Sequence, residues 1–226
     1  METVELQPYI FYAPSSITLS GPSSSGKTVM AMEILKHRQT LFSQPVHGVI
    51  YCYSEYQQTF NDPPGGDVTF HHGLPTMEEL EEYVDMFETK HFLIIYDDLM
   101  KEFAQSELMM DVATKLSHHR NFSVINITQN IFIQGKAARS QSLNSGYYIL
   151  TRTTRDLRQI ATLGSQLFPG KSSQFVAVYK DAVDNPVNPN FVPHLLVGCH
   201  PQKTVRGCQL LSNIFSPEGQ MILYRL

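Results

Sequence analysis

The sequence predicts an α/β protein in which helices cover both faces of a mainly parallel sheet. Segments typical of buried strands alternate with segments of helical periodicity, and this order is typical of a three-layer α/β fold. The run Phe92–Tyr96 is apolar at every position, as in strands that are covered on both faces. A glycine-rich segment, residues 21–28, joins one predicted strand directly to a predicted helix. The length of 226 residues favours one domain over residues 1–226, with an N-terminal extension at 1–14 and a C-terminal segment at 184–226 packed on the core.

The predicted elements follow from periodicity and from the turn residues between them. In chain order, we expect strands at 16–20, 48–54, 68–70, 92–96, 123–128 and 147–151, and helices at 29–42, 77–87, 105–116 and 156–168. In the 77–87 segment, Leu80 and Tyr83 share one face with three other apolar residues. The acidic residues between them are expected to form a solvated face rather than a metal site.

The glycine-rich segment matches the phosphate-binding motif G-x-x-x-x-G-K-[ST] in full. It reads Gly21, Pro22, Ser23, Ser24, Ser25, Gly26, Lys27 and Thr28. Its place after a strand and at the start of a helix is the one that phosphate binding requires, because backbone N–H groups and the helix N-terminus then point at the phosphates. We therefore predict that ATP binds here, with Lys27 on the β- and γ-phosphates and the Thr28 hydroxyl on Mg²⁺.

A second acidic element is expected at the end of another buried parallel strand. Asp97 follows the run 92–96 and is predicted to hold Mg²⁺, while Asp98 is predicted to orient the attacking water as a general base, with Glu102 as its rival. Gln129, at the end of the 123–128 strand, is predicted to be a polar sensor of the γ-phosphate. A sensor strand between the P-loop strand and the Asp97 strand is typical of ASCE, or RecA-like, P-loop NTPases.

Charge is distributed unevenly along the chain. Residues 1–114 carry 5 Lys/Arg against 17 Asp/Glu, whereas residues 115–180 carry 9 basic residues against one acid. Such a block indicates a surface that meets phosphates, either of nucleotide or of nucleic acid. Lys136 and Arg139, in the glycine-containing segment after the sensor strand, are the candidates for contact with DNA.

Cysteine, histidine and hydropathy patterns argue against several other classes of site. The three cysteines, Cys52, Cys199 and Cys208, have no metal-ligand spacing and indicate free thiols in a reducing compartment. The nine histidines also show no ligand spacing. Since no apolar run approaches 18 residues, we predict a soluble, intracellular protein without a membrane partner.

Several segments together resemble the viral genome-packaging ATPases of the FtsK–HerA superfamily, the group carried by poxviruses, adintoviruses and Polinton/Maverick elements. Beyond the P-loop, the resemblance rests on residues 50–56, 99–102, 117–130, 134–136, 139–144 and 168–169. It spans roughly residues 15 to 215, and its specificity lies in the order and spacing of these segments. The chain differs from many relatives in having Asp98 where they have Glu, and His118 where they often have Arg.

The resemblance implies a function, partners and a location. The activity would be ATP-driven translocation of double-stranded DNA into a preformed viral capsid by a homo-oligomeric ring. An arginine would reach the ATP of a neighbouring subunit, and Arg120, just before the sensor strand, is the first candidate, followed by Arg152 and Arg155. The protein would act in the nucleus or cytoplasm of an infected host cell, with association with the virion as a further option.

Two other functions are compatible with the motifs. A nucleoside or nucleotide kinase also has a P-loop, and Arg152, Arg155 and Arg158 could form its lid. However, a kinase does not need a sensor strand between the P-loop strand and the Asp97 strand. A scaffold that binds ATP but barely hydrolyses it is the third alternative.

Overall fold

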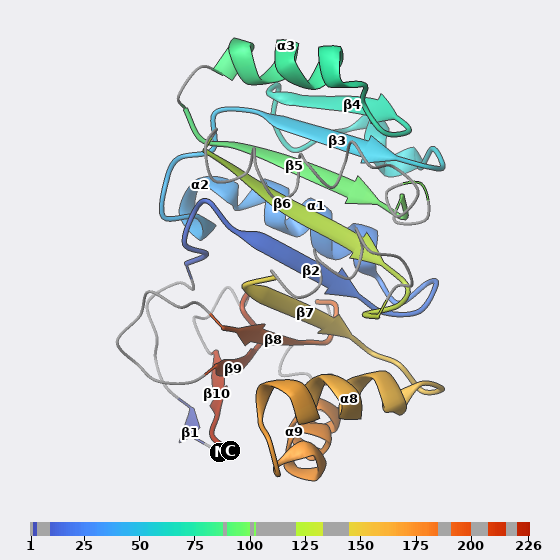
Figure 1. Ribbon diagram of the computed structural model, residues 1–226, viewed down its shortest axis with the longest axis vertical. Helices are drawn as coiled ribbons and strands as arrows, with labels where there is room; N and C mark the ends of the chain where they lie inside the picture. The colour runs from blue at the N-terminus through green and yellow to red at the C-terminus, as the bar shows by residue number, and fades with distance from the viewer. Residues whose placement is uncertain are drawn as a thin grey trace.

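A computed structural model (Figure 1) describes residues 2–3, 10–87, 90–99, 102, 121–132, 145–184, 191–199, 208–215 and 221–226. In these residues the chain forms one ten-stranded sheet of order β1-β10-β9-β8-β7-β2-β6-β5-β3-β4. The strands are β1 Glu2–Thr3, β2 Ser16–Ser20, β3 Val49–Tyr53, β4 Val68–His72, β5 Phe92–Asp97, β6 Phe122–Thr128, β7 Tyr147–Thr151, β8 His194–Gly198, β9 Gln209–Ser212 and β10 Ile222–Tyr224. The helices are α1 Lys27–Lys36, α2 Arg38–Leu41, α3 Met77–Phe87, α8 Leu157–Leu167 and α9 Ser172–Asp184, with a 3₁₀ turn, η1, at Gln58–Asn61.

The six strands from β7 to β4 run parallel, so their carboxyl ends share one edge of the sheet. All six strands were predicted, and β6 lies between β2 and β5 as the sensor-strand interpretation requires. The predicted helices at 29–42, 77–87 and 156–168 are also found, the first of them divided into α1 and α2. The helix predicted at 105–116 falls outside the described residues.

Alternation of side chains along the strands divides the core between the two faces of the sheet. On β5, Leu93 and Ile95 join the cluster under α1, whereas Ile94 and Tyr96 join the cluster under α3. At the β7–β8 side of the sheet, α8 and α9 pack against these two strands, on the face opposite α1 (Figure 1). The chain thus forms helix, sheet and helix layers, which confirms the predicted three-layer α/β class with a mainly parallel sheet.

The part of the sheet beyond β7 is antiparallel, and the sequence interpretation missed its elements. Strands β8, β9 and β10 follow one another and extend the sheet, and β1 pairs with β10. The helix α9 before them packs tightly on α8, since a Cβ at Gly164 would lie 2.7 Å from the Phe175 ring. Strands β8, β9 and β10 have only three to five residues each, which gives little periodicity to read.

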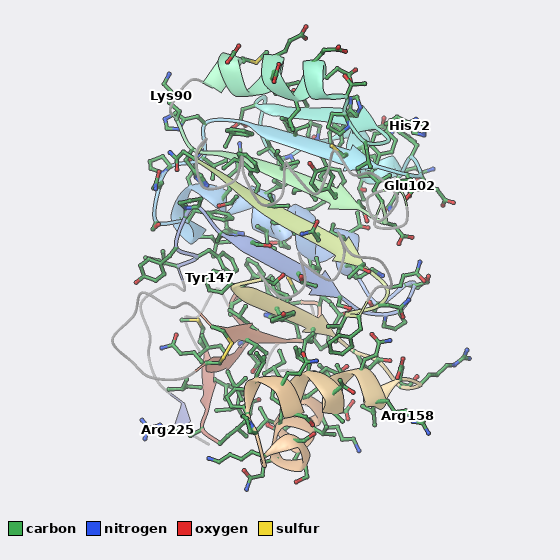
Figure 2. The ribbon with its side chains drawn as sticks, viewed as in Figure 1. His72, Lys90, Glu102, Tyr147, Arg158 and Arg225 are labelled. Carbon is green, nitrogen blue, oxygen red and sulfur yellow. A yellow bond between two sulfur atoms is a disulfide. The ribbon has the colours of Figure 1, made fainter. Side chains whose placement is uncertain are left out.

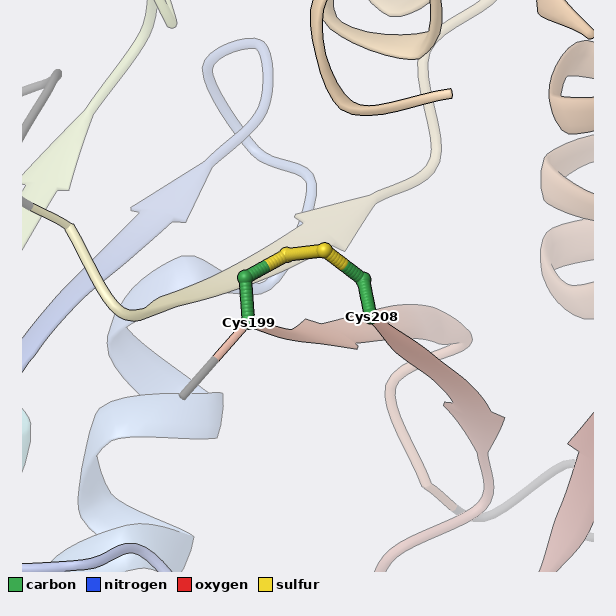
Figure 3. Close-up of a disulfide and its surroundings, with 2 residues drawn as sticks. All are labelled: Cys199 and Cys208. Carbon is green, nitrogen blue, oxygen red and sulfur yellow. A yellow bond between two sulfur atoms is a disulfide. The ribbon is translucent and has the colours of Figure 1, made fainter. Parts of the chain in front are cut away.

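The prediction of three free thiols was wrong. Cys199 and Cys208 form a disulfide that joins the end of β8 to the start of β9 (Figure 3), while Cys52 is buried and free. The pairing of β8 with β9 brings the two cysteines together, and this pairing was invisible in the sequence. Of the described helices, none is long and apolar enough to cross a membrane.

Thiol titration tests the Cys199–Cys208 disulfide. In denaturant without reductant, we expect one reactive thiol per chain, and three after reduction. In the native protein Cys52 should react slowly, because burial raises the pKa of its thiol to about 12. Replacing both Cys199 and Cys208 by serine should lower the free energy of unfolding by about 2–3 kcal/mol, as expected for a closed loop of this length. Three thiols in the unreduced, denatured chain would contradict the bond.

Candidate functional site

The P-loop lies at the carboxyl edge of the sheet, between β2 and α1. Two of its residues have left-handed backbone conformations, Ser24 with φ 61° and Gly26 with φ 87°. Such turns direct successive N–H groups into the loop, where an anion can be bound. Gly21 is required for a different reason, because a Cβ there would lie 1.8 Å from the Thr151 hydroxyl oxygen. The sequence pattern and the backbone therefore agree on a loop shaped to surround phosphate.

Lys27, the first residue of α1, points back into this loop. Its Nζ donates a hydrogen bond to the Pro22 carbonyl oxygen at 2.8 Å. Burial lowers the pKa of Lys27, and the nearby carboxylates of Asp98 and Asp97 act in the opposite direction. A buried cation held by a single carbonyl can exchange this partner for phosphate oxygens, which are stronger acceptors.

The two predicted magnesium ligands lie together. The Thr28 hydroxyl on α1 and Oδ2 of Asp97 at the end of β5 are 3.5 Å apart. Among the described residues, no group of three or more His, Cys, Asp or Glu side chains could hold a metal. One carboxylate and one hydroxyl suit Mg²⁺, which takes its remaining ligands from phosphates and water. These residues therefore fit the metal that normally accompanies ATP.

A tyrosine that the sequence interpretation missed holds Asp97 in place. Tyr51, fully buried on β3, donates its phenol hydrogen to Oδ2 of Asp97 at 2.7 Å. Gln57 holds the other ligand, donating to the Thr28 hydroxyl at 3.2 Å. The signal for Tyr51 was present in the sequence, because a phenol in a strand buried on both faces needs a hydrogen-bond partner.

Asp98 and Gln129 also contact each other directly. Gln129, which follows β6, donates from Nε2 to Oδ2 of Asp98 at 2.9 Å. Asp98 has a left-handed φ of 57°, which turns its exposed side chain away from the line of β5. The structure thus brings the predicted base and the predicted sensor together. The rival base Glu102 is also exposed and lies near the carboxyl end of β5 (Figure 2).

A pocket of about 190 Å³ adjoins the P-loop, next to the ends of β6 and β7 and the start of α8. Its lining comes from the P-loop, the tip of β6, the end of β7 and the start of α8: Ser20, Gly21, Pro22, Ser23, Gln129, Asn130, Ile131, Thr151, Thr153, Arg155, Asp156, Gln159 and Ile160. Arg155, whose side chain is exposed, borders this pocket and so lies near the P-loop of its own chain. Arg152 forms an ion pair with Asp184, its Nε lying 3.2 Å from Oδ1. Arg120, Lys136 and Arg139 lie outside the described residues.

Asp97→Asn should make the protein more stable in the absence of Mg²⁺. Burial raises the pKa of Asp97 more than the Tyr51 hydrogen bond lowers it. A carboxyl whose pKa is higher in the folded than in the unfolded chain costs stability as pH rises above the unfolded value, and the full cost is present above the folded value. We therefore expect a higher unfolding temperature for the variant at pH 8, and a difference that shrinks as pH falls towards 4. With Mg²⁺ and ATP the order should reverse, since the wild type keeps the carboxylate for Mg²⁺ and therefore gains more stability from the ligand. A less stable variant at pH 8 without ligand would contradict this account.

Comparisons with known proteins support the fold and leave the family open. No protein-family model matches the sequence, and none of the curated proteins compared with it matches. Solved structures of the genome packaging NTPase B204 from Sulfolobus turreted icosahedral virus 2 are similar to the structure of this chain. The AMPPCP complex gives a TM-score of 0.53 at 13% identity over 91% of this chain and 98% of that chain. The ATP-gammaS complex gives a TM-score of 0.52 at 12% identity over 87% of this chain and 96% of that chain. B204 from Sulfolobus turreted icosahedral virus, described as a DNA-packaging ATPase, gives a TM-score of 0.51 at 11% identity over 87% of this chain and 96% of that chain. At this identity the likeness shows that the chain has a P-loop NTPase fold.

Proposed function

We propose that this chain hydrolyses ATP to move double-stranded DNA into a viral capsid. The observation that carries the proposal is the grouping of polar residues after three adjacent strands. The P-loop follows β2, Gln129 follows β6, and Asp97 and Asp98 stand at the end of β5. A carboxylate and an amide that lie together at the phosphate-binding edge can orient and activate a water molecule for attack on the γ-phosphate.

Each residue has a role in this hydrolysis. The Lys27 ammonium group stays beside the transferred phosphoryl group and stabilises its negative charge, and the P-loop N–H groups hold the β-phosphate. Thr28 and Asp97 would hold Mg²⁺, which neutralises charge on the phosphate oxygens when it is bound. Asp98 accepts the proton of the attacking water, and Gln129 keeps Oδ2 of Asp98 oriented through its 2.9 Å hydrogen bond.

The proposed DNA substrate and capsid partner rest on other observations. The basic block at residues 115–180 suits a polyanion, and Lys136 and Arg139 follow the sensor strand within it. The sequence resembles viral packaging ATPases, and B204, whose fold is similar, is described as a genome packaging NTPase. A ring of identical subunits would surround the DNA, with Arg120 reaching the neighbouring nucleotide.

A nucleoside kinase is the competing function, and the position of Arg155 at the pocket favours it. The decisive experiment measures ATP turnover alone, with double-stranded DNA and with a panel of nucleosides, using Lys27→Ala protein purified in the same way as the control. A motor should be stimulated by DNA of any sequence. Its DNA affinity should fall about 10³–10⁵-fold between 50 and 200 mM salt if 6–10 phosphates are contacted. Transfer of phosphate to a nucleoside would establish the kinase instead.

The base is assigned by a second pair of variants. Asp98→Asn should still bind ATP but lose hydrolysis, because the shape of the side chain is kept while its proton acceptor is lost. Glu102→Gln is the matched variant, since it makes the same change at the rival carboxylate. If Glu102→Gln is the inactive one, the two roles are exchanged.

A further inference from the structure

The side chain of Gln159, on α8, holds the tip of β6 through its amide group. The Oε1 atom of Gln159 accepts a hydrogen bond from the backbone N–H of Ile131 at 2.7 Å. Its Nε2 atom donates to Oδ1 of Asn130 at 3.0 Å. Asn130 and Ile131 are the two residues that directly follow Gln129, so Gln159 fixes the chain next to the predicted sensor.

Gln159 is itself fixed on a well-packed helix. Its Nε2 also donates to Oδ2 of Asp156 at 2.6 Å, and Asp156 is the N-cap of α8. Ile160 and Leu163, on the buried side of the same helix, are 3% and 1% exposed in the core beneath it. The hydrogen bonds of Gln159 therefore connect the sensor segment to a rigid part of the fold.

Only an amide of this length satisfies these contacts. The site needs one acceptor for Ile131 and donors for Asn130 and Asp156, and a glutamine amide supplies both kinds of group. Glutamate would keep the acceptor but place a second carboxylate against Asp156. Leucine would keep the approximate volume and lose every one of these hydrogen bonds.

Gln129 needs such support because its own side chain is exposed. Gln129, Asn130 and Gln159 line the same pocket as P-loop residues Gly21 to Ser23. Holding a long, exposed side chain in one place costs conformational entropy, and a fixed backbone reduces this cost. We infer that Gln159 is a positioning residue for hydrolysis, which holds the tip of β6 so that Gln129 stays beside Asp98 and the P-loop. The inference rests on the proposed ATPase function.

The test compares Gln159→Leu with Gln166→Leu, an exposed glutamine on the same helix. We expect kcat of Gln159→Leu to fall by up to about 10²-fold, the effect of a displacement of about 1 Å in a catalytic site. ATP affinity should stay at the wild-type value, because Gln159 does not belong to the phosphate-binding loop. Gln159→Glu should give a smaller loss, which provides a second reading if the leucine variant folds poorly.

A double-mutant cycle separates positioning from a general structural role. If Gln159 acts through Gln129, adding Gln159→Leu to Gln129→Ala should cause no further loss of kcat. Additive losses, an unchanged kcat in Gln159→Leu, or an equal loss in Gln166→Leu would overturn the inference. A wild type that hydrolyses no ATP, or a fully active Lys27→Ala, would instead overturn the proposed function itself.

Discussion

Lys27→Ala should reduce ATP hydrolysis by about 10²–10³-fold or more, because the variant lacks the buried cation that accompanies the transferred phosphoryl group. In the structure this ammonium group has a carbonyl partner, Pro22, which it can release to phosphate oxygens. The measurement is the rate of phosphate release with saturating ATP and Mg²⁺. Lys36→Ala is the control, since Lys36 belongs to the same helix but lies on the surface, 3.9 Å from Glu33. Normal turnover in Lys27→Ala would remove the P-loop from the mechanism.

Arg120→Ala should have the second large effect, about 10³–10⁵-fold, if this arginine stabilises charge on the ATP of a neighbouring subunit. The variant should still bind ATP and should be inactive alone. Mixed with Lys27→Ala subunits it should regain part of the activity, because some interfaces then combine an intact P-loop with an intact arginine. Arg225→Ala, a change of an exposed arginine near the C-terminus (Figure 2), is the control.

Two outcomes would contradict the assignment of Arg120. The first is the absence of activity in assemblies shown to contain both variants, which would mean that another residue supplies the charge. Turnover per subunit that is independent of protein concentration would count against any contribution from a neighbour. Arg155 is then the next residue to test, and its position at the pocket of its own chain predicts that its loss cannot be restored by mixing.

The parallel part of the sheet could be predicted because its signals are local. A run such as Phe92–Tyr96 needs two covered faces, and a phosphate-binding loop needs a strand before it and a helix after it. The carboxyl ends of parallel strands meet at one edge, so the neighbourhood of Asp97 and Gln129 followed from their positions after their strands. Their detailed contacts did not follow, because the 2.9 Å hydrogen bond to Asp98 depends on a left-handed turn at that aspartate.

The antiparallel part and the supporting side chains depend on long-range pairing. The Cys199–Cys208 bond follows from the register of β8 and β9, and strands this short give little periodicity. Gln159 reaches Ile131 across 28 residues of chain, and its spacing along α8 is that of any partly exposed helical residue. Such contacts are decided by how helices and strands meet, which a single sequence pattern does not encode.

Tyr51 would give the proposed magnesium site an optical signal of its own. The chain has 11 tyrosines and no tryptophan, so its near-ultraviolet absorption and emission are dominated by phenol rings. The phenol hydroxyl of Tyr51 donates a hydrogen bond to Oδ2 of Asp97, the oxygen that faces Thr28. A cation that draws electron density from this carboxylate weakens the hydrogen bond and shifts the phenol spectrum. If Mg²⁺ binds at Asp97 as proposed, the difference spectrum between the wild type and Tyr51→Phe should report metal occupancy without any added dye.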